Sequence, residues 1–211
     1  MSRRKWLVLT ALTMEAKAIA AELGWTPADQ DVCIQVIGLR AGRFDRGGLG
    51  QFDGVILAGL AGGLDPALGV GDVVCDATRE KPWGDLPLRR GKIYTADHLL
   101  ATAIEKARLF RETGCLAVDM EGGIVRAAAE SAGIPLLNIR AISDTAGQSV
   151  PQRMVNWVDD VGRARPGRVT ADLIAHPLLI ASMIRLGKQS RFAVRRLAEA
   201  VRQVVQSPAP V

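Results

Sequence analysis

The sequence has few aromatic residues, few cysteines and no long uninterrupted apolar run. Aromatic residues make up only 4% of the 211-residue chain, whereas alanine, leucine, valine and glycine are abundant. Because small aliphatic side chains let helices pack closely on a sheet, this composition favours an α/β protein over an all-β sandwich. The length suits one domain with a substantial core and is short for two.

The three cysteines, Cys33, Cys75 and Cys115, lie far apart within apolar segments. They form no CxxC pair, and the two histidines add no metal-ligand spacing. We therefore expect reduced thiols in a cytosolic protein, with no disulfide and no metal.

The N-terminal segment resembles a signal peptide only superficially. Basic residues precede the apolar residues 6–14, but the charged residues Glu15 and Lys17 follow directly. Such charges suit a buried strand that runs into a helix better than a cleaved leader. No apolar run approaches the roughly 18 to 20 residues that a membrane span requires. We expect a cytoplasmic protein.

The net charge of +5 lies in the C-terminal segment. From His176 onward there is one acidic residue, Glu199, against six basic residues: Arg185, Lys188, Arg191, Arg195, Arg196 and Arg202. On a helix the basic residues and the apolar residues from Val194 to Val204 fall on different stripes. This helix could contact an anionic membrane peripherally or pack with a solvated face, and both alternatives stay open. We expect no nucleic-acid partner, although a basic tail alone does not exclude one.

Apolar runs alternate with helical patterns, which is typical of parallel strands joined by crossover helices. Strands are predicted at residues 6–10, 32–37, 55–58, 72–76, 116–119 and 136–141, and helices at 14–23, 43–49, 101–112 and 122–132. A loop is predicted at 78–91, an irregular stretch with one helix at 143–167, and two final helices before and after Gly187. We expect a three-layer α/β/α fold with a mostly parallel twisted central sheet, a main domain at 1–175 and a basic helical tail at 176–211.

Ligands of open α/β sheets bind at the carboxyl ends of the strands. That edge would collect Glu15, the glycine cluster at 59–63, residues 119–121 and residues 143–144. The glycine cluster, which includes Ala61 and Gly62, exposes backbone N–H groups, although its spacing matches neither a dinucleotide fingerprint nor a P-loop. Several carboxylates would therefore share one rim with a bare backbone loop.

Three ordered motifs carry a family resemblance: GLAGGLDPALGVGDVV at 59–74, AVDMEGG at 117–123 and IRAISD at 139–144. A weaker fourth is ALTMEAKAI at 11–19. The chain resembles the nucleoside phosphorylase and nucleosidase superfamily from Trp6 to about Ala146. The resemblance implies a homo-oligomeric enzyme that cleaves the N-glycosidic bond of a purine nucleoside and needs no metal or organic cofactor, with inorganic phosphate as co-substrate if it is a phosphorylase.

The resemblance also implies roles at matching positions. Glu121 would accept hydrogen bonds from the ribose hydroxyls, beside Asp119 and with Met120 under the sugar, and its charge would stabilise an oxocarbenium-like transition state. Asp144, held protonated in a partly apolar site and oriented by Ser143, would act as general acid toward the purine. Arg140 would support the carboxylates or the glycine loop. Taken alone, Glu121 could be a first-turn helix carboxylate and Asp144 a helix cap.

The attacking nucleophile stays undecided. Glu15 matches the carboxylate with which nucleosidases of this family activate water, whereas Arg40 and Arg43 are candidate phosphate ligands. Leu99 stands where small-substrate nucleosidases have an aromatic residue over the purine, so base stacking is in doubt, although the backbone of Leu99 and Leu100 could still recognise the adenine edge.

The compact length and the short loop at 78–91 resemble the hopanoid-associated subgroup, which implies phosphorolysis of a 5′-lipid-substituted nucleoside such as adenosylhopane. The alternative is hydrolysis of methylthioadenosine, adenosylhomocysteine or futalosine, which Glu15 favours. A non-catalytic nucleoside-binding or membrane-adaptor protein is a third alternative, and the retained Glu121 and Asp144 disfavour it.

Overall fold

The computed structural model describes residues 4–79, 83, 86–151, 159, 165–176 and 179–207, the side chains of 172–174 and 179–180 excepted. Within these residues the strands form one twisted sheet, in which β2, β1, β3 and β8 are consecutive neighbours that run parallel and β2 is at the edge. The parallel strands are β1 (Trp6–Thr10), β2 (Val32–Val36), β3 (Gly54–Gly63) and β8 (Leu136–Asp144). The remaining strands are β4 (Val73–Ala77), β5 (Arg89–Arg90), β6 (Ile93–Thr95) and β7 (Ala117–Asp119).

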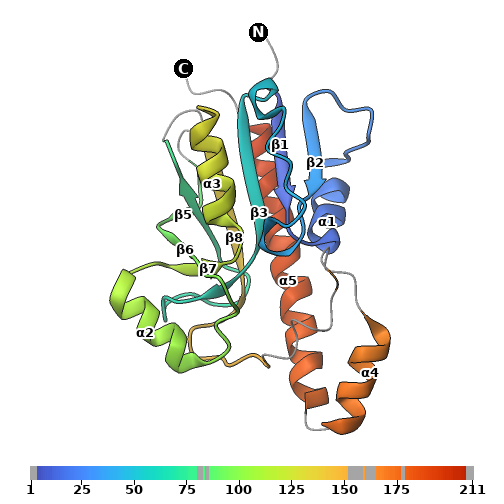
Figure 1. Ribbon diagram of the computed structural model, residues 1–211, viewed down its shortest axis with the longest axis vertical. Coiled ribbons are helices and arrows are strands. Elements are labelled where there is room, and N and C mark those ends of the chain that lie inside the picture. Colours follow the sequence, from blue (N-terminus) through green and yellow to red (C-terminus); the bar gives the residue numbers. More distant parts are fainter. Residues whose placement is uncertain are drawn as a thin grey trace.

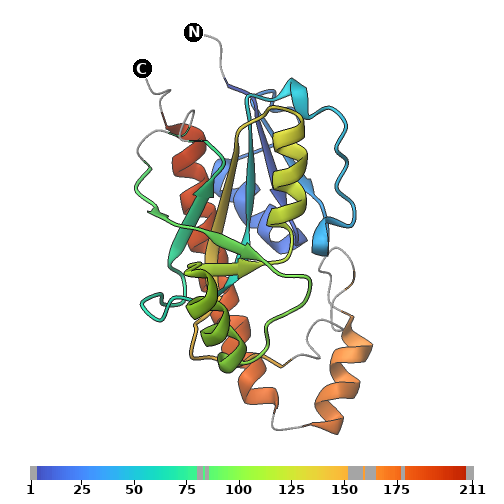
Figure 2. The ribbon, with the colours of Figure 1, turned by 60° about the vertical axis from the view of Figure 1, so that its left-hand side comes forward.

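Helices cover both faces of the sheet, which confirms the predicted three-layer α/β/α fold. Helix α3 lies on one face, and α1 and α5 lie side by side on the other (Figures 1 and 2). Strand β4 runs antiparallel to β8, and β7 runs antiparallel to the end of β3, so the sheet is mixed but mostly parallel. The helices are α1 (Thr13–Leu23), α2 (Ala103–Thr113), α3 (Gly122–Ser131), α4 (Pro166–Ala175) and α5 (Leu179–Gln206).

The glycine cluster is part of a strand, so the prediction that the buried strand ends at Ala58 was wrong. Strand β3 continues to Gly63, pairing with β8 along its length and with β7 at its end. A Cβ at Gly59 would collide with the Arg140 guanidinium and would lie 3.3 Å from Glu15 Oε1. The glycine therefore makes room for a buried arginine within the sheet rather than for a turn.

Two helix predictions were also wrong. Residues 43–49 form no helix; instead, short 3-10 helices occur at Leu39–Ala41 and Leu49–Gln51, and Gly48 between them has φ 75°. Helix α5 runs through Gly187 without a break. Gly187 is exposed, and its cost of about 1 kcal/mol in a helix is small beside the apolar burial along α5. The two short strands β5 and β6 were not predicted, and most of the irregular stretch at 143–167 lies outside the described residues.

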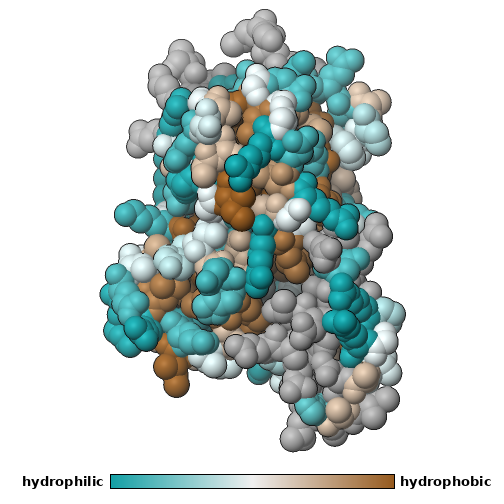
Figure 3. Space-filling model, viewed as in Figure 1, coloured by the Kyte–Doolittle hydropathy of each residue, from teal (hydrophilic) through white to brown (hydrophobic). Residues whose placement is uncertain are grey.

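The C-terminal half of α5 belongs to the main hydrophobic core. The apolar stripe that the sequence marked packs with Trp6, Ile56 and Ile139, and consists of Val194, Leu197, Val201 and Val204. This half of the helix therefore has the packed arrangement with a solvated basic face. In the described part of the chain, no helix combines the length and apolarity needed to cross a bilayer. Figure 3 shows polar and apolar side chains interspersed over the described part of one face.

We predict that Gly59→Ala lowers the free energy of unfolding by about 1–3 kcal/mol, because the added methyl overpacks the Arg140 site. Gly50→Ala is the matched control: Gly50 is exposed and a Cβ there would meet nothing within 4 Å, so the expected change is within about 0.5 kcal/mol. Urea unfolding of both variants measures the difference, and equal midpoints would contradict the packing role of Gly59.

Candidate active site

A pocket opens where β1, β3 and β8 end and the chain leaves the sheet. The structure brings most of the sequence-predicted site residues into its wall. These are Glu15, Ala61, Gly62, Leu99, Leu100, Asp119, Met120, Glu121, Arg140, Ser143 and Asp144. Arg40 and Arg43 are exposed and are not among the residues that line it.

Arg140 is the buried cation of the pocket, with no solvent exposure. Its Nη2 atom lies 2.7 Å from Asp119 Oδ2 and 3.5 Å from Glu121 Oε2, and its Nε donates to Asn138 Oδ1 at 2.9 Å. The guanidinium therefore fixes the position of two carboxylates, that of Asp119 at the end of β7 and that of Glu121 just after it.

The Asp119 carboxylate is engaged by donors of the protein itself. Thr95 Oγ1 and Asn138 Nδ2 each donate to its carboxylate at 2.8 Å, and the Gly122 N–H donates at 3.1 Å. Burial alone would raise the pKa of Asp119, but Arg140 and these donors outweigh it, and the pKa lies below its ordinary value. Asp119 is thereby a charged anchor for Arg140.

Glu15 projects from α1 into the pocket and is only 1% exposed. Its two carboxylate oxygens accept N–H bonds from Leu12 and Leu60, each at 2.9 Å. Burial raises the pKa of Glu15 to about 7, and those two N–H groups and Arg140 only partly oppose the rise. The side chain can therefore exchange a proton near neutral pH.

Glu121 is held from two sides. Burial raises the pKa of Glu121, while Arg140 and the Arg40 N–H, which donates to Oε1 at 3.0 Å, act against the rise. Arg40 has φ 54° and the next residue, Ala41, has φ 53°, a left-handed conformation that is costly outside glycine. The contribution of Arg40 to the pocket is thus its backbone N–H, and its side chain is exposed.

Asp144 ends β8 and lies between two donors. Ser143 Oγ donates to Asp144 Oδ1 at 2.7 Å, which is the orienting contact that the sequence suggested, and it also lies 3.2 Å from the Ala61 carbonyl. The Lys106 ammonium donates to Oδ2. A buried cation thus lies against the Asp144 carboxylate, in a pocket wall that also contains apolar side chains.

Apolar side chains form much of the remaining wall. Met120 and Leu99 are half-buried and Leu100 is buried, and they are joined by Ala11, Leu12, Leu39, Leu60 and Val118, which the sequence did not mark. His98 also lines the pocket and pairs with the exposed Asp97.

The arrangement suits acid and base chemistry at neutral pH. A carboxyl group with a pKa near 7, Glu15, and the Lys106-paired carboxylate of Asp144 share one pocket wall, and two carboxyl groups in such different environments are suited to proton transfer. In the part of the chain that the structure describes, no group of three or more His, Cys, Asp or Glu side chains could hold a metal ion.

A family model matches the part of the chain that holds most of this site. A family model described as the Phosphorylase superfamily matches residues 75–175. A 5′-methylthioadenosine/S-adenosylhomocysteine nucleosidase of Mycobacterium bovis is 40% identical over 91 residues, which are 43% of this chain and 34% of that protein. The nucleosidase of the same description from Treponema pallidum is 38% identical over 69 residues, covering 30% and 26%. The matches thus span about a third of the length of these curated relatives, or less.

Structural comparisons cover nearly the whole chain. A Helicobacter pylori 5′-methylthioadenosine/S-adenosylhomocysteine nucleosidase with butyl-thio-DADMe-Immucillin-A superposes with a TM-score of 0.66 at 16% identity, covering 97% of this chain and 99% of that one. Futalosine hydrolase of the same organism gives a TM-score of 0.63 at 16% identity, covering 96% and 97%. At such identities the likeness concerns the fold. The matched family segment and this shared fold agree: residues 75–175 match the Phosphorylase superfamily model, and the fold of the chain is like that of these solved structures.

Proposed function

We propose that this protein hydrolyses the N-glycosidic bond of an adenine nucleoside. The observation that carries the proposal is Glu15, a carboxyl group buried in the pocket wall with a pKa of about 7. A base with that pKa can take a proton from water at neutral pH. The similar proteins are described as methylthioadenosine/adenosylhomocysteine nucleosidases and a futalosine hydrolase, which supports the same reaction class.

In the proposed reaction, Glu15 removes a proton from water as the water oxygen bonds to the sugar C1′. The bond between C1′ and the base nitrogen breaks, and its electron pair leaves with the base. Asp144 hydrogen-bonds or donates a proton to the purine N7, with Ser143 fixing one carboxylate oxygen. The products are free adenine and the sugar with a new hydroxyl at C1′.

The sugar end of the pocket is the acidic end. Glu121 would accept hydrogen bonds from the 2′ and 3′ hydroxyls, with Met120 against the sugar. Because C1′ becomes positively charged as the bond breaks, the nearby negative charge lowers the barrier. Arg140 and the Arg40 N–H keep this carboxylate in place before the substrate arrives.

The base would contact the wall that contains Leu99 and Leu100, with Ala61 and Gly62 of β3 alongside. Leu99 provides apolar contact without aromatic stacking. Methylthioadenosine, adenosylhomocysteine and futalosine are the proposed candidate substrates, since the similar proteins are described by these activities.

Phosphorolysis of a lipid-substituted nucleoside such as adenosylhopane has less support. It needs a phosphate site, and the arginines that the sequence suggested, Arg40 and Arg43, have exposed side chains outside the pocket lining. Water therefore fits this pocket better than phosphate as the nucleophile.

Three further properties accompany the proposal. The protein would work without a metal or organic cofactor, in the cytoplasm, and as a homo-oligomer. Peripheral membrane contact would have to use the exposed basic residues of α5, such as Arg191 and Arg195, because the apolar stripe of its C-terminal half is packed in the core.

We predict adenine release from methylthioadenosine that is independent of inorganic phosphate and unaffected by a chelator. Chromatography of reactions with and without phosphate, and with and without EDTA, measures it. The variant Arg40→Ala, Arg43→Ala should keep the wild-type rate, because neither side chain lines the pocket. Release that required phosphate and was lost in this variant would make the enzyme a phosphorylase.

We predict that kcat/KM rises with pH and levels off above about pH 7. Glu15 must be deprotonated to accept a proton from water, and its raised pKa delays that deprotonation to near neutrality. Glu15→Gln should remove this rise and lower kcat/KM by roughly 10²–10⁴-fold. Glu22→Gln on the same helix is the control, since Glu22 is exposed. A wild-type profile that is flat between pH 5 and about 8 would speak against Glu15 as the base.

We predict that Glu121→Gln lowers kcat/KM by about 10²–10³-fold, because the neutral amide stabilises the cationic sugar poorly. Glu130→Gln on α3, at an exposed position, should leave it unchanged. Steady-state kinetics with methylthioadenosine compare the two. Equal rates in both variants would remove Glu121 from the sugar site.

A further inference from the structure

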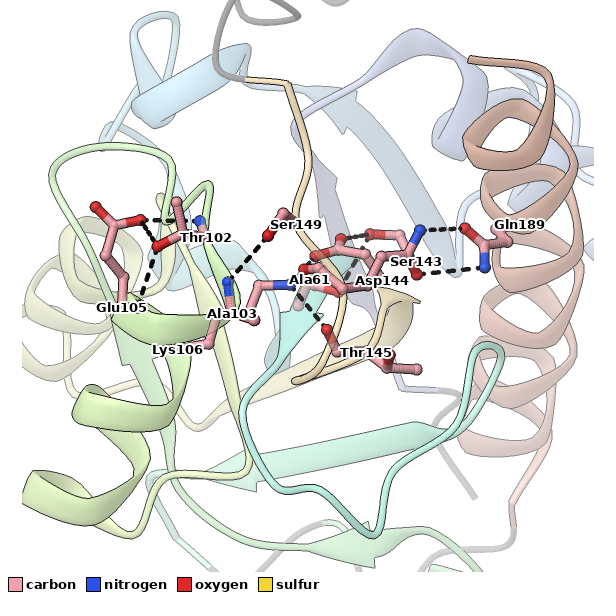
Figure 4. Close-up of polar contacts among 11 residues, drawn as sticks. Ala61, Thr102, Ala103, Glu105, Lys106, Ser143, Asp144, Thr145, Ser149 and Gln189 are labelled. Atoms are coloured by element: carbon pink, nitrogen blue, oxygen red, sulfur yellow. Dashed lines mark hydrogen bonds and ion pairs between the residues drawn. The ribbon is translucent and has the colours of Figure 1, made fainter. Parts of the chain in front are cut away.

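Lys106 is a fully buried lysine that the proposed reaction does not yet use. It lies on α2 with 0% side-chain exposure. Its ammonium donates to Asp144 Oδ2, to the Thr145 carbonyl at 3.0 Å and to the Gln148 carbonyl at 2.9 Å (Figure 4). All three N–H donors of the ammonium therefore have acceptors, and one acceptor is the carboxylate at the leaving-base end of the pocket.

The surrounding backbone is fitted to this lysine. Gly62 of β3 lies beside the pair: a Cβ at that position would be in ordinary contact, 3.4 Å from Asp144 Oδ2 and 3.6 Å from Lys106 Cε. The loop after β8 is fastened to α2 and to α5. Ser149 Oγ accepts the Ala103 N–H at 3.2 Å, and the side-chain amides of Gln148 and Gln189 bond to each other at 2.9 and 3.3 Å. The loop that offers its carbonyls to Lys106 is thus held from both sides.

Burying an ammonium is costly, and lysine is almost never fully buried unless it is paired. The polar partners of Lys106 are two carbonyls and one carboxylate, Asp144, so that carboxylate supplies the compensating charge. The pair also occupies Asp144 Oδ2, which leaves Oδ1, held by Ser143, as the other oxygen through which Asp144 can act on a ligand.

The charge of the pair matters for bond cleavage. When a glycosidic bond breaks, the sugar becomes positive and the departing base becomes negative. Glu15 and Glu121 lie in the pocket wall with Arg140, which is already engaged by Asp119 and Glu121. Once Asp144 has given its proton to the purine N7, a carboxylate remains beside the departing base, and without Lys106 its charge would have no cation against it. With Lys106, that end of the pocket is neutral and carries a cation.

We propose that Lys106 is a positioning residue for departure of the base: it fixes the Asp144 carboxylate and neutralises its charge at the end of the pocket where the base leaves. This inference rests on the proposed hydrolysis of an adenine nucleoside. Lys106 acts through Asp144 and does not itself line the pocket.

The test is a double-mutant cycle with Lys106→Met, Asp144→Asn and the combined variant, assayed for adenine release from the nucleoside that the wild type cleaves. Lys106→Met should lower kcat at least about 10-fold, part of the roughly 10²–10⁴-fold that a positioned acid contributes, with a smaller change in KM. The combined variant should have the kcat of Asp144→Asn within about twofold, since one residue acts through the other. Lys188→Met, at an exposed position on α5, is the control and should match the wild type.

The cycle also covers a folding defect. Lys106→Met leaves the Asp144 charge without its partner and should lower the melting temperature, whereas the combined variant removes both charges and should recover part of it. If Lys106→Met yields no folded protein, a combined variant with kcat well below that of Asp144→Asn would still overturn the proposal, because equal kcat values are expected of these two variants.

Two results would overturn the proposal. Wild-type kcat in Lys106→Met would show that base departure does not depend on it. A combined variant whose kcat falls well below that of Asp144→Asn would show that Lys106 acts by another route. Adenine release by the wild type separates these results from failure of the proposed function, since a wild type that releases no adenine would overturn both.

Discussion

The buried guanidinium of Arg140 is the interaction on which the pocket depends. It has no solvent exposure, it pairs with Asp119 at 2.7 Å, and it lies within 3.5 Å of Glu121. Removing one member of such a network leaves an unpaired buried charge, which is far more costly than losing a surface ion pair. Burial of the guanidinium also constrains the sheet, because a side chain at Gly59 would occupy the space of the guanidinium. The packing of β3 at Gly59 and the geometry of the pocket around Arg140 therefore depend on each other.

The sequence predicted the layers and most of the pocket, because parallel buried strands leave long apolar runs and their carboxyl ends meet at one edge. Strand β1 was predicted with its observed bounds. Predictions failed where tertiary contacts override local preference. The glycines after Ala58, which were predicted to follow the strand, belong to β3 and lie beside Arg140. Helix α5 continues through Gly187 because burial of the helix's apolar face outweighs the cost of a glycine. The roles of the pocket residues stay predictions.

Lys106 shows why part of the site could not be predicted. In α2 it falls on the same helical stripe as Ala103 and Phe110, so a lysine among inward-facing positions was the one available signal. Its partners are Asp144 and two carbonyls 39 and 42 residues further along the chain. Spacing along a helix does not reveal a contact made across such a separation. The roles of Arg40 and Arg43 as phosphate ligands stay predictions: the residue type suits phosphate, but both side chains are exposed and neither lines the pocket.

Arg40 meets Glu121 through its main chain, in a left-handed conformation shared with Ala41. Every residue type except proline carries that N–H, so the contact itself does not require an arginine side chain, and the left-handed backbone is the remaining constraint on the residue type. A substitution at position 40 can consequently change the surface charge while Glu121 keeps its hydrogen bond from the backbone N–H. A family built on this loop could diverge in its outer surface, and in what that surface attracts, without rebuilding the interior.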